Sequence, residues 1–105
     1  MSNVASFFND SLPAKLTEHP DLADEINAIY QFDIEGAGTW TVDLTAAPGS
    51  VSEGAHDDPG CVVTCADEDF SSLLENPATG MMLFTMGKLK VSNVGLALSL
   101  QKILG

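Results

Sequence analysis

The fold is decided by residues 30–45, whose sequence is YQFDIEGAGTWTVDLT. Apolar residues stand at positions 30, 32 and 34 before a glycine-containing turn, and at positions 40, 42 and 44 after it. Alternation with a period of two on both sides of such a turn predicts an antiparallel hairpin with one apolar face and one solvated face. The acidic residues and threonines between the apolar positions then belong to the solvated face, and they do not form a catalytic cluster.

Shorter elements are expected on both sides of this hairpin. On its amino-terminal side the apolar spacing and the prolines predict short helices. On its carboxyl-terminal side, turn signals separate two short strands. The expected helices cover residues 4–9, 12–19 and 21–24, and the expected strands cover residues 50–53, at a sheet edge, and residues 60–64.

Two further helices are expected between residues 67 and 87. Asp67-Glu68-Asp69 opens the first helix, which places Phe70, Leu73 and Leu74 on one face. Acidic residues at a helix start offset the helix dipole, so this triplet indicates a helix start and not an acid–base site. The second helix begins at Asn76-Pro77 and ends at Gly87.

The second of these helices contains the sequence Met81-Met82-Leu83-Phe84-Thr85-Met86. This short segment holds three of the four methionines of the protein. Thioether side chains are flexible and polarizable, so they fill irregular cores and also suit surfaces that accept ligands of several shapes. Both interpretations, buried core and adaptable binding surface, are open from composition alone.

The chain closes with a strand and an apolar helix. Lys88-Leu89-Lys90-Val91 alternates, which predicts an edge strand with its lysines facing water. Ser92-Asn93 caps a helix from Val94 to about Leu104 that is apolar almost all the way round, so a partner, a membrane or a ligand is expected to cover it. Gln101 lies in the apolar sector, where an amide is paired with backbone or directed at the polar group of an apolar ligand.

Charge is distributed unevenly along the chain. The net charge is −11, and the four basic residues are all lysines, so nucleic-acid binding is not expected. Residues 1–75 hold all 15 acidic residues and one lysine, whereas residues 76–105 hold three lysines and no acidic residue. This polarity favours either an orientation against an anionic head group or membrane, or simply the placement of acids for solubility away from a buried segment.

The totals indicate one domain, residues 1–105, with a modest core and a cytoplasmic location. No apolar run is long enough to cross a membrane, and the first residues do not form a secretory signal. Cys61 and Cys65 are expected to be buried free thiols, because the pair would lie about 13 Å apart along a strand. No metal site and no cofactor are predicted, because His19 and His56 complete no ligand spacing.

At the level of whole segments, the chain resembles the sterol carrier protein type-2 family. The segments that carry the resemblance are Tyr30–Ile34, Trp40–Leu44, Asp67–Phe70, Gly87–Val91 and Asn93–Ala97. The resemblance implies an α+β fold: a five-stranded, largely antiparallel sheet covered on one side by helices. It also implies an apolar tunnel between sheet and helices that takes up fatty acid, fatty acyl-CoA, sterol or phospholipid. The expected ligand-binding residues are Phe70, Leu73, Leu74, Met81, Met82, Phe84, Met86, Leu96, Leu98, Leu100, Gln101 and Leu104.

A non-catalytic lipid carrier with transient membrane contact is therefore the functional prediction. The alternative is an accessory domain that docks its apolar last helix on a lipid-metabolising enzyme or on a second copy of itself. An enzyme acting on an apolar substrate is disfavoured, because the apolar last 30 residues contain no acidic residue. The chain differs from the family at Ala66, where serine often caps the helix, so Asp67 is expected to cap instead. It also lacks the carboxyl-terminal tripeptide for peroxisomal import.

Overall fold

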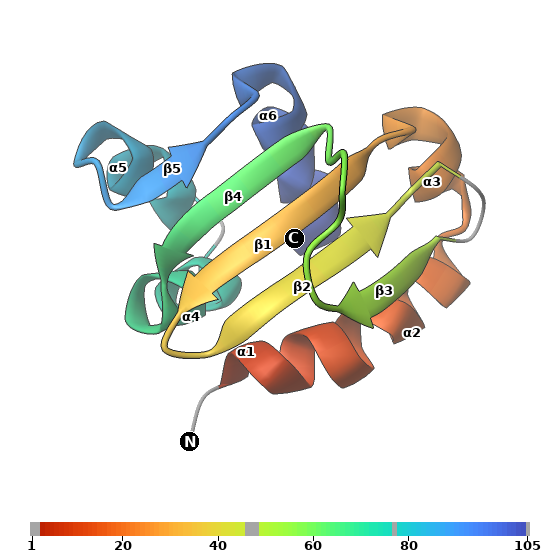
Figure 1. Ribbon diagram of the computed structural model, residues 1–105, viewed down its shortest axis with the longest axis horizontal. Coiled ribbons are helices and arrows are strands. Elements are labelled where there is room, and N and C mark those ends of the chain that lie inside the picture. The colour runs from red at the N-terminus through yellow and green to blue at the C-terminus, as the bar shows by residue number, and fades with distance from the viewer. Residues whose placement is uncertain (1–2, 46–48, 77, 105) are drawn as a thin grey trace.

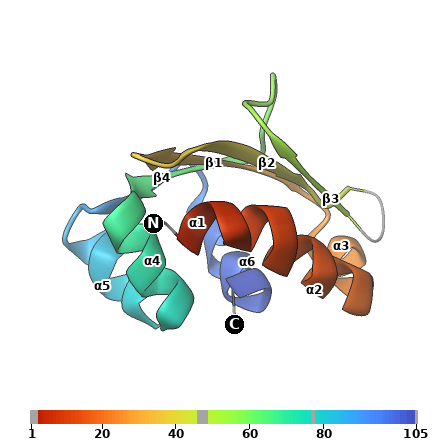
Figure 2. The ribbon, with the colours of Figure 1, turned by 90° about the horizontal axis from the view of Figure 1, so that it is seen from below.

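The computed structural model describes residues 3–45, 49–76 and 78–104, with the side chains of all of these except residue 3 and residues 100–104. Five strands form one sheet in the order β3-β2-β1-β4-β5, and three of its four pairings are antiparallel. The helices lie against one face of the sheet (Figures 1 and 2). The α+β prediction is therefore confirmed. The strands are β1 (Ile29–Glu35), β2 (Gly38–Asp43), β3 (Ser50–Glu53), β4 (Cys61–Ala66) and β5 (Leu89–Val91), and the helices are α1 (Asn3–Ser6), η1 (Phe7–Ser11), α2 (Leu12–Glu18), α3 (Asp21–Ile26), α4 (Asp67–Glu75), α5 (Thr79–Thr85) and α6 (Val94–Leu104).

β1 and β2 form the predicted hairpin. Their antiparallel register places Phe32 opposite Trp40. Phe32, Ile34 and Trp40 are at most 3% exposed, so the apolar positions of the alternation do face the core. At the turn, the Ala37 N–H donates to the Ile34 carbonyl at 3.1 Å. Gly36 adopts φ +89°, a conformation that a side chain with a Cβ strongly disfavours.

β4 pairs in parallel with β1, although it follows β3, which pairs with the other side of β2. The chain between β3 and β4 therefore crosses the face of the sheet that is turned away from the helices (Figure 1). Backbone hydrogen bonds fix both ends of this crossing. The Gly54 N–H donates to the Thr39 carbonyl, and the Gly60 N–H donates to the Ile29 carbonyl, each at 2.8 Å.

The amino-terminal helices form one nearly continuous run rather than separate pieces. α1, a π-helical turn (η1) and α2 follow one another directly. Val4, Phe8, Leu12 and Leu16 recur every four residues, so they share one face, and each is at most 1% exposed. This face packs on the sheet from below (Figure 2).

Aromatic side chains from three separate parts of the chain meet in the core. Phe8 stacks on Trp40 with ring centroids 4.7 Å apart and on Phe70 of α4 with centroids 5.6 Å apart. Phe32 lies 5.0 Å from Phe8. Each such pair contributes about 0.5–1.5 kcal/mol beyond the burial of its area. These contacts fasten the first helical run and α4 to the hairpin.

The helix ends are set by local chemistry. The N-cap position of α4 falls on Ala66, so the expectation that Asp67 caps this helix is wrong by one residue. Asp67 is instead in the first turn, where its carboxylate accepts a hydrogen bond from the Ser71 hydroxyl at 3.4 Å. After α5, Gly87 adopts φ +77° and the Lys88 N–H donates to the Leu83 carbonyl at 2.9 Å, which confirms the predicted glycine stop.

The strand and cap predicted before the last helix are also confirmed. β5 lies at a sheet edge beside β4, with Leu89 buried and Lys90 exposed. The Asn93 side-chain oxygen accepts from the Leu96 N–H at 3.2 Å, and the Asn93 carbonyl accepts from the Ala97 N–H at 2.9 Å. This capping fixes where α6 begins.

Candidate functional site

Exposed apolar side chains gather on two helices. Among residues whose side chains are described, the large hydrophobic ones that are exposed belong to α5, its C-cap residue and α6, and their exposed fractions run from 43% to 60%. Both helices lie beneath the same face of the sheet, α5 under the β5 edge and α6 nearer the middle (Figures 1 and 2). Concentrated apolar exposure in a small domain indicates a binding surface. We refer to these exposed side chains together as the α5–α6 apolar surface: Met81, Met82, Phe84 and Met86 at α5, and Val94 and Leu98 on α6.

The residues predicted to contact a ligand differ widely in burial. Some are sealed in the core, some are half-buried at its border, and others lie on the α5–α6 apolar surface. Leu100, Gln101 and Leu104 have side chains outside the described residues. Phe70 and Leu73 are buried; Leu74 and Leu96 are half-buried; Met81, Met82, Phe84, Met86 and Leu98 are exposed.

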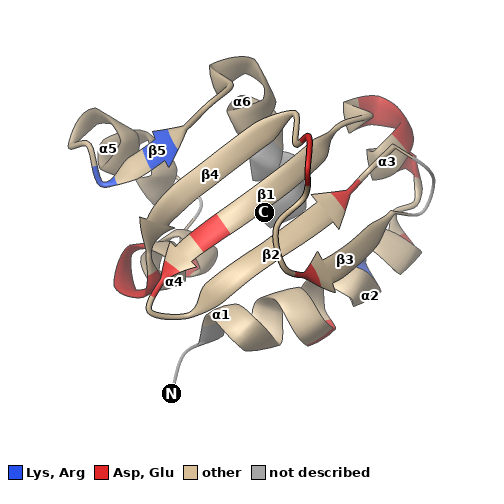
Figure 3. Ribbon diagram, viewed as in Figure 1, with Lys and Arg blue, Asp and Glu red and all other residues tan. Residues whose placement is uncertain are grey.

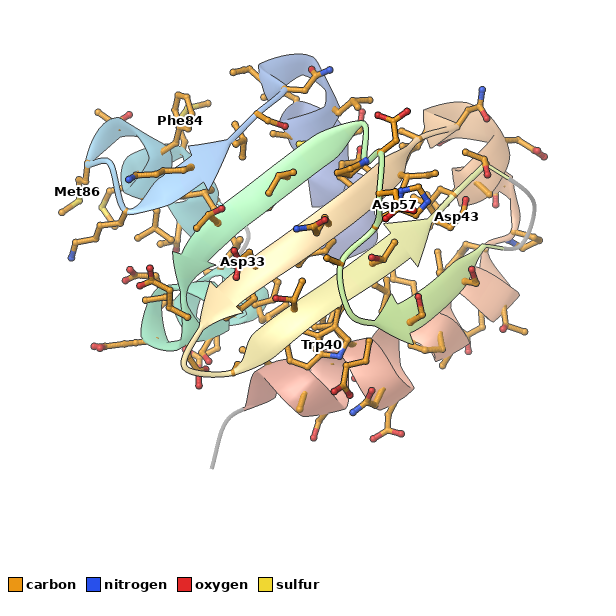
Figure 4. The ribbon with its side chains drawn as sticks, in the orientation of Figure 1. Asp33, Trp40, Asp43, Asp57, Phe84 and Met86 are labelled. Atoms are coloured by element: carbon orange, nitrogen blue, oxygen red, sulfur yellow. The ribbon has the colours of Figure 1, made fainter. Side chains whose placement is uncertain are left out.

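The inner face of α5 is closed by tight packing on α4. A Cβ at Gly80 would lie only 2.9 Å from Leu73 Cδ1, so glycine allows the two helices to approach closely. Leu83, on the same inner side, is 4% exposed. The methionines therefore have no room inside and face outward. Phe84 and Met86 both project from the outer end of α5 (Figure 4).

Polar contacts from two neighbouring strands hold α6 and its cap to the sheet. The Tyr30 hydroxyl on β1 donates to the Leu96 carbonyl at 2.7 Å, and the Cys61 thiol on β4 lies 3.5 Å from the Asn93 carbonyl. Tyr30 and Cys61 are register partners, so the two contacts lie side by side. Burial, aided by the nearby thiol of Cys61, raises the pKa of Tyr30 to about 12, and the phenol stays protonated as a donor.

Sequence reasoning treated Tyr30 only as an apolar strand position and missed this role. A signal was available: Tyr30 is the single tyrosine of the chain and stands in the buried register of the hairpin. A buried hydroxyl needs a hydrogen-bond partner, and only an element packed on the helix-covered face of the sheet can supply one. That this element is the last helix follows from tertiary structure alone.

Both cysteines are buried and free, which confirms the thiol prediction. Burial, with the nearby carboxylates of Asp69, Glu35 and Asp67, raises the pKa of Cys65 to about 12, so this thiol is not a nucleophile at neutral pH. Within the described part of the chain, no group of three or more histidines, cysteines and acids is arranged to hold a metal ion.

All acidic residues precede α5 in the sequence, but two of the helices that carry them, α3 and α4, contact α6 and α5 respectively. Figure 3 shows acidic segments at α3, at the start of α4 and in the chain that crosses the sheet, whereas the lysines near α5 are on and beside β5. Asp33, Asp43 and Asp57 lie on the face turned away from the helices (Figure 4). Among the described helices none is both long and apolar enough to cross a membrane.

Comparison with known proteins identifies the family. The SCP-2 sterol transfer family matches residues 8–105. The chain belongs to that family. This confirms the resemblance drawn from the sequence, and membership establishes lipid binding and transfer as the general function of the domain.

Individual relatives agree with this assignment. The chain is 34% identical over 92 residues to human "Sterol carrier protein 2" and 39% identical over 85 residues to "Peroxisomal multifunctional enzyme A" of Dictyostelium discoideum. These matches cover 82% and 76% of this chain, but only 17% and 19% of the two relatives, so the chain spans about a fifth of their length. The apo structure of Sterol Carrier Protein 2 from Yarrowia lipolytica superposes with a TM-score of 0.78 at 29% identity, covering 96% of this chain and 86% of that one.

Proposed function

We propose that this domain is a cytoplasmic, non-catalytic carrier that binds one fatty acid, fatty acyl-CoA, sterol or phospholipid molecule in an apolar tunnel between the sheet and the helices, reached through the α5–α6 apolar surface. The observation that carries this proposal is the confinement of the exposed large hydrophobic side chains to α5, its C-cap residue and α6, within the described residues of a lipid-transfer family.

Binding would be driven by removal of apolar lipid from water. Each buried methylene contributes about 0.8 kcal/mol, so about ten methylenes contribute roughly 8 kcal/mol before the costs of association. Methionine side chains adapt to different chain shapes with little strain, which suits a carrier of several lipids.

α6 is the element that would move to admit the lipid. Its described residues are half-buried or exposed, with Val94 and Leu98 more than half exposed at 52% and 55%. Its described polar attachments to the sheet are few, and Tyr30 makes a short one of these, at 2.7 Å. An element with little buried surface opens at a low free-energy cost.

Native mass spectrometry of the freshly purified protein, followed by organic extraction of bound material, tests the proposal. A lipid near one per chain, or stoichiometric uptake of added palmitate, is the expected result. If the lipid buries the Leu98 side chain, Leu98→Asp removes the free energy of that burial, so we expect this variant to weaken lipid uptake about tenfold to a hundredfold. Ser52→Asp, which adds the same charge on exposed β3, is the control. Equal uptake by both variants would contradict a ligand path along α6.

Trp40 is a poor reporter for this titration. Its ring is 3% exposed and stacks on Phe8, so it lies under the part of the sheet that the first helical run covers. Displacement of a fluorescent fatty acid reads the α5–α6 apolar surface more directly.

A second candidate function is an accessory domain that docks on a lipid-metabolising enzyme. It is favoured by relatives in which a domain of this kind forms a small part of a longer chain, such as "Peroxisomal multifunctional enzyme A" and human "Hydroxysteroid dehydrogenase-like protein 2", of which the match covers 21%. A protein that takes up none of the lipid classes in solution, yet forms a stoichiometric complex with such an enzyme, would support this candidate over the carrier.

A further inference from the structure

We infer that the outer end of α5, with the adjacent β5 edge, is a docking surface for an anionic lipid bilayer. This docking end consists of Met81, Met82, Phe84, Met86, Lys88 and Lys90. The inference deepens the proposed carrier function, on which its biological purpose rests, but the binding itself is measurable without any bound lipid.

The apolar side chains of the docking end are placed where they can insert partly into a bilayer. Met81, Met82 and Met86 are 56–60% exposed and Phe84 is 43% exposed. They stand on a short helix whose inner side is already packed through Leu83. Neither α4 nor the sheet can cover them without unpacking that contact. Long flexible apolar side chains on a rigid support enter the boundary between head groups and acyl chains at little entropic cost.

The charged part has the sign that an anionic bilayer requires. Lys88 and Lys90 are both exposed and lie within four residues of Met86 in sequence. Figure 3 places the lysine-bearing segment at the same end of the molecule at which Figure 4 places Phe84 and Met86. No acidic residue occurs after Glu75, whereas the rest of the chain is strongly acidic. An anionic surface therefore attracts the two lysines of this end and repels the acidic parts of the molecule, which include the first turn of α4, the helix that contacts α5. The balance of the two orients the protein as it approaches.

A second copy of the chain fits this surface less well than a bilayer. Two docking ends face to face would set lysines against lysines, in a protein that already carries a net charge of −11. Four side chains also offer far less area than the roughly 1,200–2,000 Å² of a stable protein interface. A fluid bilayer needs no shape complementarity, and it gains from each inserted side chain separately.

Co-sedimentation of delipidated protein with vesicles tests the inference. Binding is expected to vesicles of phosphatidylcholine with about 30% phosphatidylserine, to be weaker without phosphatidylserine, and to fall as salt rises. One lysine near such a surface is worth a factor of about five in partitioning, so Lys88→Gln with Lys90→Gln should weaken binding about tenfold or more. Met86→Asp should weaken it further, because it places a carboxylate where an apolar chain inserts.

A matched control separates local from global charge. Thr17→Glu with Ser52→Glu changes the net charge by the same two units at exposed sites on α2 and β3. This control should bind vesicles within about twofold of the unsubstituted protein, because charges beyond a Debye length of about 8 Å are screened. Loss of binding in the control equal to that in the lysine variant would overturn the inference.

Two other results would also overturn the inference. One is the absence of vesicle binding by the unsubstituted protein. The other is a concentration-dependent dimer or enzyme complex that Met86→Asp abolishes, formed by a protein that does not bind vesicles. Failure of the carrier proposal is recognised separately, by the absence of palmitate uptake in solution without vesicles. The lysine variant should take up palmitate normally but deliver it to anionic vesicles more slowly. Vesicle binding without palmitate uptake would refute the carrier proposal but would not contradict the inference that the docking end binds a bilayer.

Discussion

Removing one hydroxyl should loosen the last helix. In Tyr30→Phe the ring stays in its fully buried position, but the 2.7 Å hydrogen bond to the Leu96 carbonyl is lost, together with the contact to the Ser99 hydroxyl of the same helix. A buried hydrogen bond contributes about 1 kcal/mol net. The larger cost of an orphaned carbonyl does not apply, because inside α6 the Leu96 carbonyl is also within reach of the backbone N–H four residues further on. We therefore expect a loss of about 1 kcal/mol.

This loss should appear first as local opening of α6. A change of 1 kcal/mol raises the population of the opened helix about fivefold. Amide hydrogen exchange in peptides from α6 should accelerate by that factor, while exchange in β1 and β4 changes little. Release of bound palmitate should accelerate about as much, if α6 is the element that moves.

Thr41→Val is the matched control. It removes another side-chain hydroxyl that donates to a backbone carbonyl, that of Gly54, at 2.8 Å. This bond joins β2 to the chain that crosses the sheet, so exchange should accelerate near Gly54 and not in α6. Equal exchange of α6 in Tyr30→Phe and the unsubstituted protein, or equal acceleration in both variants, would refute the reasoning about Tyr30.

Three further predictions concern stability. Phe70→Ala removes the ring that packs on Phe8 and Phe32, and should lower the free energy of unfolding in urea by about 3–5 kcal/mol; a loss below 1 kcal/mol would mean that these contacts are not formed. Gly87→Ala places a residue with a Cβ at φ +77° and should lower the free energy of unfolding by about 1 kcal/mol. The melting temperature should fall by several degrees, and an unchanged melting temperature would contradict this prediction. The pKa values of Tyr30 and Cys65 rise from 10.0 and 9.0 to about 12 on folding, so the folded state retains protons that the unfolded state releases. The free energy of unfolding should therefore be full below about pH 9 and fall toward pH 12, and the fall should be less steep in Tyr30→Phe. A free energy of unfolding that stays constant across that range would contradict this prediction.

Local sequence signals predicted most of the elements, because the interactions that form them are also local. Alternation around Gly36 predicted the hairpin, Gly87 predicted the end of α5, and Asn93 predicted the start of α6, and each is confirmed. Errors were of position: the N-cap of α4 falls on Ala66, α5 begins at Thr79 and not at Asn76-Pro77, and the first helices merge through a π-helical turn.

The candidate site was harder to predict than the fold. Phe70 and Met81 belong to the same predicted ligand-binding set, but the first is fully buried among aromatic rings and the second is 60% exposed. Apolar character is the same in both cases, so composition cannot separate core from binding surface. The separation depends on which side of α5 meets α4, and that is decided by the close approach at Gly80.

The sequence by itself determined the strands, most of the helices and some of their ends, the acidic character of the chain and its basic last part. These depend on side-chain alternation, on backbone preferences of glycine and asparagine, and on charge, all of which act within a few residues. Only the tertiary structure decided that β4 lies parallel to β1, that Tyr30 holds α6, and that methionines and lysines share one outer end. Those features join segments that are distant along the chain, and their partners are set by how the core packs as a whole.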